Sequence, residues 1–78
     1  MFSTDLKLLN DYIKESGYRR EYIAKFLGLS RASFIYRMRG KIDFSVSEAN
    51  KLCILLDLNT TDIMNIFFAK KLNVTHLS

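Results

Sequence analysis

Apolar residues recur every three or four positions along most of the chain, and no stretch keeps the strict alternation of a half-buried strand. This period is typical of amphipathic helices and predicts an all-α protein. Three glycines, at positions 17, 28 and 40, interrupt the pattern. Because glycine readily takes the left-handed conformation that ends many helices, each glycine predicts a helix end. The pattern therefore predicts a compact bundle of about five short helices.

The first half of the chain is expected to hold three of these helices. The first begins near Thr4, which acts as its N-cap, and ends at Gly17. The second spans about 20–27, and the third spans about 30–39 with Ser30 as its N-cap. The residues expected to face the core share the helical spacing: Leu6, Leu9, Ile13, Ile23, Ala24, Leu27, Phe34 and Met38.

The second half predicts two further helices. Residues 45–48, Ser-Val-Ser-Glu, have the spacing of a capping box, so a fourth helix begins there and ends near Asp57. Thr60 or Thr61 can cap a fifth helix. The inward residues are predicted to be Val46, Ala49, Leu52, Cys53, Leu56, Ile63, Ile66 and Phe67. Residues 69–78 lack a clear period and are interpreted as a tail or a dimerisation segment.

Length and composition limit the functions open to this chain. With 78 residues, 49% of them apolar, we expect a single domain with one core in residues 4–68. No apolar run approaches the roughly 20 residues that cross a bilayer, and the chain does not start with a signal-peptide pattern, so a cytoplasmic protein without membrane contact is expected. Cys53 and His76 stand in no metal-binding or catalytic motif. We therefore expect no enzyme activity, no cofactor, no metal and no small-molecule substrate.

Positive charge is concentrated in the middle of the chain. Residues 19–41 contain seven basic residues and one acid, Glu21, which leaves a charge of +6, whereas each flank carries −1. Such an uneven distribution favours a polyanionic partner such as nucleic acid.

The same segment has the pattern of two short helices joined by a tight turn. Ala24 is small enough for the two helices to cross closely, Gly28 permits the turn, and Leu29 fills the corner before Ser30 starts the second helix. Phe34 is expected to hold this second helix on the core. The residues then expected to face outward, where they can enter a major groove, are Arg31, Ala32, Ser33, Tyr36 and Arg37.

On these residues the chain resembles the phage repressor and Cro family of helix-turn-helix regulators, whose pattern is roughly Gln-x-x-Leu-Ala-x-x-x-Gly-Val-Ser-x-x-x-Ile followed by Gly-Lys. The matching positions are Arg20, Ile23-Ala24, Gly28-Leu29-Ser30, Phe34 and Gly40-Lys41. The resemblance covers about residues 4–68 and implies a five-helix, lambda-repressor-like fold. The chain departs from the family at Arg20, where glutamine is common, at Arg37-Met38, and in lacking a loop proline.

The resemblance also implies separate roles for two groups of residues. The start of the third helix reads base edges, and Arg31 is the strongest candidate because arginine can donate two parallel hydrogen bonds to guanine. The implied base readers are Arg31, Ala32, Ser33 and Tyr36. The residues implied to bind DNA phosphates are Arg19, Arg20, Arg39 and Lys41, together with the outward-facing Arg37.

Two interpretations of function remain open from the sequence. The first is a transcriptional regulator, most like a Cro-type repressor of a phage or mobile element, that binds double-stranded DNA as a homodimer through Met64, Phe68 and Leu72. The alternative is an antirepressor or antitoxin whose helical surface binds another regulatory protein or a toxin. Ile35, Tyr36 and Arg37 would suit such a protein interface.

Overall fold

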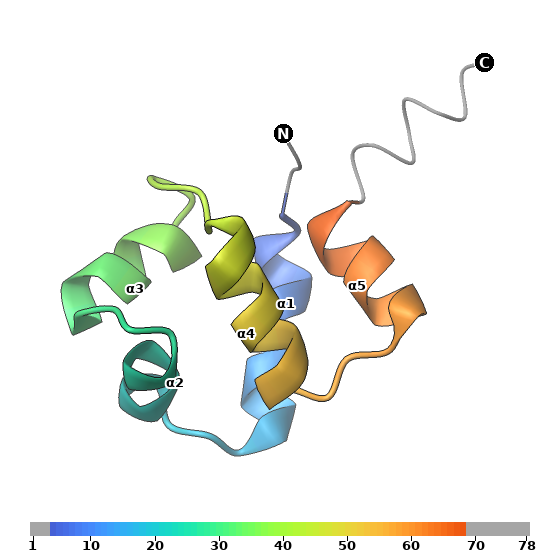
Figure 1. Cartoon of the computed structure of the whole chain (residues 1–78), viewed down its shortest axis with the longest axis horizontal. Helices are drawn as coiled ribbons and strands as arrows, with labels where there is room; N and C mark the ends of the chain where they lie inside the picture. Colours follow the sequence, from blue (N-terminus) through green and yellow to red (C-terminus); the bar gives the residue numbers. More distant parts are fainter. Residues whose placement is uncertain (1–3, 69–78) are drawn as a thin grey trace.

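The computed structural model describes residues 4–68, which form five α-helices and, within that range, no β-strand. In chain order the helices are α1 (Leu6–Ser16), α2 (Arg20–Phe26), α3 (Arg31–Met38), α4 (Val46–Leu55) and α5 (Thr60–Phe67). In Figure 1, α2 and α3 lie on one side of the molecule, α5 lies on the other, and α1 and α4 lie between them. The predicted all-α bundle is confirmed, and residues 69–78, including Leu72, lie outside the described residues.

Two of the predicted N-caps are wrong by one or two residues. Asp5, and not Thr4, is the N-cap of α1, and its carboxylate accepts a hydrogen bond from a backbone amide of the first turn. Asn59, and not Thr60 or Thr61, caps α5 through a reciprocal capping box. In both cases the side chain that caps the helix bears a carboxyl or amide oxygen, which serves at least as well as a threonine hydroxyl.

The two serine caps are confirmed. Ser30 and Ser45 take extended backbone angles and accept hydrogen bonds from the amides of Ser33 and Glu48, three residues further on. At α4 the Glu48 side chain also accepts from the Ser45 amide, which completes the predicted capping box. The starts of α3 and α4 are therefore fixed by local chemistry.

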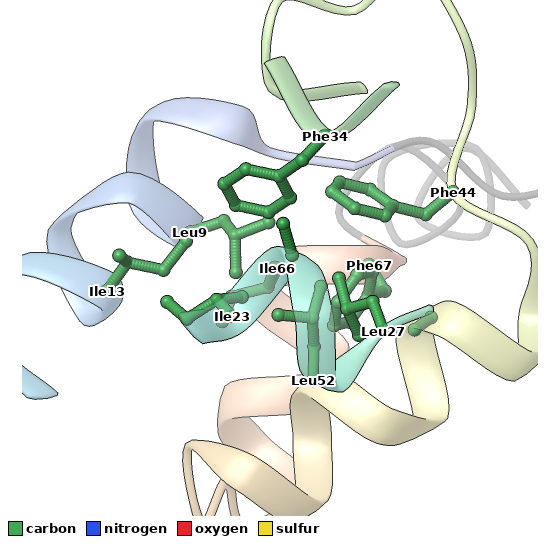
Figure 2. Close-up of a cluster of buried hydrophobic side chains, with 11 residues drawn as sticks. Leu9, Ile13, Ile23, Leu27, Phe34, Phe44, Leu52, Ile66 and Phe67 are labelled. Carbon is green, nitrogen blue, oxygen red and sulfur yellow. The ribbon is translucent and has the colours of Figure 1, made fainter. Parts of the chain in front are cut away.

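The core is a single cluster to which every helix contributes. Its fully buried members are Phe34, Phe67, Leu9, Ile23, Leu52 and Ile66. Phe44, in the loop before α4, is also buried, and Figure 2 shows the rings of Phe34 and Phe44 pointing into the cluster. Phe44 precedes the Ser45 cap and Ala49 lies in the first turn, which are the two positions of a hydrophobic staple.

The prediction that Val46 faces the core is wrong. Its side chain is 75% exposed on the first turn of α4. Phe44, two residues earlier, enters the core instead, at the position before the Ser45 cap that a hydrophobic staple uses.

The prediction that Arg37 faces outward is also wrong. Its Nε donates to the Glu48 carboxylate at 2.8 Å, and the two side chains are only 16% and 13% exposed. The guanidinium also donates to the carbonyl of Ser33 one turn back on α3. Because Glu48 is the capping-box residue of α4, this ion pair ties the end of α3 to the start of α4.

The Glu48 carboxyl is held in its charged form. Burial alone raises its pKa, but the hydrogen bonds from the Ser45 amide and the Arg37 guanidinium outweigh burial and keep the pKa below the usual value of 4.5.

A second polar contact joins the first and last helices. The Tyr12 hydroxyl on α1 donates to one oxygen of the Asp62 carboxylate on α5 at 2.6 Å. The other oxygen of this carboxylate accepts a hydrogen bond from the backbone amide of Asn59. The hydrogen bond to Asp62, assisted by burial, raises the pKa of Tyr12. Asp62 therefore both completes the capping box of α5 and joins α5 to α1.

We predict that Glu48→Gln lowers the free energy of unfolding by about 1 kcal/mol at pH 7, because it keeps a capping oxygen but removes the charge that pairs with Arg37. Since the folded-state pKa is depressed, the wild-type advantage is complete above about pH 4.5 and is lost as the pH falls through the folded-state pKa. Urea denaturation of both proteins from pH 7 to pH 3 measures this difference. A difference in free energy of unfolding that stays constant over this range would contradict the prediction. Glu15→Gln, at an exposed position on α1, serves as the control.

Candidate nucleic-acid interface

The connection between α2 and α3 is a tight turn built from four residues, 27–30. Gly28 has a φ of +76°, a conformation that L side chains rarely adopt, and no atom lies within 4 Å of where its Cβ would be. The requirement for glycine is therefore conformational and not steric. Leu29 is partly buried against the core, and its amide donates to the carbonyl of Ala24, which is itself buried. These contacts fix α3 beside α2.

The first turns of α3 expose three of the four predicted base readers. Arg31 and Ala32 are exposed, and the Tyr36 side chain is 46% exposed. Ser33 differs, because it is only partly exposed and its hydroxyl accepts a hydrogen bond from the Ser30 hydroxyl at 3.0 Å. Phe34, at 1% exposure, anchors the opposite side of the helix. The outward face of α3 is therefore defined by Arg31, Ala32 and Tyr36.

A depression beside the start of α3 gathers three arginines. It has a volume of about 490 Å³ and is lined by Tyr18, Arg19, Arg20, Glu21, Arg31, Phe34 and Ile35. We call it the arginine pocket. The sequence placed Arg31 among base readers and Arg19 and Arg20 among phosphate contacts, and the structure brings all three together.

The electrostatics of the arginine pocket favour an anion. Three arginines are among its lining residues, and Glu21 is the only acid among them. Arg20 is oriented by a hydrogen bond to the Asn10 side chain on α1. Guanidinium groups match phosphate and carboxylate oxygens by paired hydrogen bonds, so a phosphate group satisfies the chemistry of this pocket.

The remaining predicted phosphate contacts follow α3. Arg39 and Lys41 are exposed, and Gly40 between them has a φ of +78° that reverses the chain. The Lys41 amide donates to the Tyr36 carbonyl at 3.0 Å, and its ammonium lies 5.9 Å from the centre of the Tyr36 ring. Basic groups therefore lie at both ends of α3, whereas Arg37 is occupied by Glu48.

Sequence reasoning missed an aromatic surface formed by α2 and the residues just before it. Tyr18, Tyr22 and Phe26 are 42%, 50% and 39% exposed, and their rings stack with centroids 5.4 and 6.5 Å apart. We call these three residues the aromatic stack. Their spacing of four residues, out of register with the buried Ile23 and Leu27, is the signal that would have revealed it.

The residues predicted for a dimer contact are only partly placed on the surface. Met64 is 36% exposed, whereas Phe68 is partly buried and packs against the core. Phe68 is the C-cap of α5, and its part in a dimer contact stays a prediction. Val46 and Ile54, at 75% and 65% exposure on α4, are the most exposed large apolar side chains of the described residues.

The described residues contain no cluster of three histidine, cysteine, aspartate or glutamate side chains that could hold a metal ion. Cys53 is a partly buried free thiol that packs against the core, and burial raises its pKa. No helix within residues 4–68 is long and apolar enough to span a bilayer.

Comparisons with protein-family models, with curated proteins and with solved structures find no match to this chain. Its function is therefore inferred from its residues and their geometry.

We predict that Ser30→Ala lowers the free energy of unfolding by about 1 kcal/mol, because the first turn of α3 loses its side-chain acceptor. Thermal or urea denaturation measures the loss. Ser47→Ala, which changes an exposed serine inside the first turn of α4, is the matched control and is expected to change stability by less than about 0.5 kcal/mol. Equal effects of the two substitutions would contradict a capping role for Ser30.

Proposed function

We propose that this protein is a sequence-specific, double-stranded DNA-binding transcriptional regulator of the helix-turn-helix kind, with α3 in the major groove. The observation that carries the proposal is the arginine pocket, which lies beside the exposed, capped start of α3. A groove-reading helix needs an exposed face for bases and cationic groups beside it for the phosphates. Arg31 belongs to both groups, because it lines the arginine pocket and lies in the exposed first turn of α3.

Base reading is assigned to the exposed face of α3. Arg31 lies in the first turn, from which its guanidinium can reach the O6 and N7 of a guanine. Ala32 offers a methyl group to thymine, and Tyr36 presents a ring and a hydroxyl one turn further on. The Ser33 hydroxyl accepts a hydrogen bond from the Ser30 hydroxyl in the free protein. To contact a base, Ser33 has to replace this hydrogen bond with one to the DNA.

Backbone binding is assigned to the cations that flank this face. Arg19 and Arg20 lie at the start of α2, and Arg39 and Lys41 follow α3, so a duplex lying along α3 has cations at both ends. Arg37 is left out of this set, because its charge already neutralises Glu48.

The regulator is proposed to act in the cytoplasm as a homodimer on a two-fold operator with half-sites about 34–36 Å apart. Met64 of the predicted contact remains exposed, and Val46 and Ile54 add exposed apolar area on α4. Occupation of such an operator represses transcription by excluding other proteins, as in the phage Cro-type repressors that the segment resembles.

The aromatic stack favours a second candidate function, which is binding to another regulatory protein or a toxin. Its three rings are stacked and exposed, and aromatic side chains are enriched at protein interfaces. A protein-binding module would show DNA binding that depends on salt but not on sequence.

We predict that selection of bound duplexes from a random library at about 0.15 M salt enriches a two-fold motif for the wild-type protein. Arg31→Ala is expected to weaken binding to that motif by about 1–3 kcal/mol and to remove the base preference at one position of each half-site. Lys14→Ala, an exposed cation on α1, is the control and is expected to preserve the motif. Failure of the wild type to enrich any motif would instead favour the protein-binding candidate.

We also predict that Arg39→Ala lowers the affinity for all sequences alike and reduces the slope of log K against log salt concentration by about 1, because one fewer counterion is released from the phosphates. Fluorescence anisotropy on one selected and one scrambled duplex between 50 and 300 mM salt provides the two slopes. An unchanged slope would remove Arg39 from the backbone contacts.

A further inference from the structure

The loop after α3 is tied by backbone hydrogen bonds to the last turn of that helix. The left-handed Gly40 reverses the chain, and the Lys41 amide then donates to the Tyr36 carbonyl at 3.0 Å. A Cβ at position 40 would come within 3.3 Å of a Leu6 methyl group, so the turn also packs closely on α1. The backbone of Lys41 is therefore held in place relative to Tyr36 before any ligand arrives.

The Lys41 side chain makes a second contact with the same residue. Its ammonium lies 5.9 Å from the centre of the Tyr36 ring, within the range of a cation–π interaction. Tyr36 is 46% exposed, so this contact lies at the surface of the proposed interface. A ring that carries a cation over one face keeps its other face, its edge and its hydroxyl available to a base pair.

We propose that Lys41 is a positioning residue that fixes the orientation of the Tyr36 ring and thereby determines the base preference at the position that Tyr36 reads. This inference rests on the proposed DNA-binding function. It changes the role of Lys41 from a phosphate contact that only adds affinity to a residue that also acts on specificity. Because the contact exists in the free protein, Tyr36 reaches the DNA with its ring already oriented, and less side-chain entropy is lost on binding.

Selection from a random duplex library tests the inference with three variants. Lys41→Gln removes the cation, and Lys41→Arg keeps both the charge and the ability to lie over a ring. Lys25→Gln removes an exposed lysine from α2 and is the matched control. We expect Lys41→Gln to reduce discrimination at one position of each half-site by about two- to fivefold, the effect of one exposed cation–π contact, while Lys41→Arg and Lys25→Gln keep the wild-type motif.

A measurement without DNA tests the contact itself. Protons of the Lys41 side chain that lie over the Tyr36 ring experience its ring current, so their NMR signals are expected to shift when Tyr36 is changed to Leu but not when it is changed to Phe. Circular dichroism of each variant verifies that the helices are retained.

Two results would overturn the inference while leaving the proposed function intact. One is a Lys41→Gln variant that weakens binding to all sequences equally with its motif unchanged, which would reduce Lys41 to a phosphate contact. The other is a Lys41 side chain whose signals do not respond to Tyr36→Leu. A wild-type protein that enriches no motif would overturn the proposed function, and this inference with it, so the wild-type selection separates the two failures.

Discussion

Burial of the Phe34 ring is the constraint on which the proposed interface depends. α3 has only eight residues, too few for a stable helix in water, and its orientation is fixed by packing. Phe34 is its one fully buried side chain, and removing a buried phenylalanine ring typically costs about 3–5 kcal/mol. With that ring in the core, Arg31, Ala32 and Tyr36 have no alternative to the surface. The exposure of the proposed reading face is thus a consequence of core packing.

Most of the fold could be predicted because its determinants are local. The helical period located all five helices, and Gly17, Gly28 and Gly40 have the positive φ values that helix ends at these positions require. The errors arose where a tertiary contact determines which side chain is buried, or where two neighbouring side chains can both cap a helix. Asp5 and Asn59, and not the neighbouring threonines, are the N-caps of α1 and α5. Phe44 entered the core from a loop, where no periodicity marks it.

The candidate site was predictable as a set of residues but not as an arrangement. Charge along the sequence identified residues 19–41, yet only the packing of α2 against α3 places Arg31 beside Arg19 and Arg20. The sequence gives no sign that Arg37 is neutralised, because its partner Glu48 lies eleven residues away in the next helix. The contact between Lys41 and Tyr36 likewise depends on the chain reversal at Gly40. The pattern of residues along the chain does not reveal which side chains pair between helices.

The arginine pocket has a consequence for the balance between folding and binding. Three arginines of like charge line this depression, and a bound anion would add a favourable electrostatic interaction that the free protein lacks. A polyanion that neutralises them binds only the folded chain with this geometry, and it therefore shifts the folding equilibrium by mass action. Under the proposed function, molecules bound to DNA are therefore more resistant to unfolding than free ones.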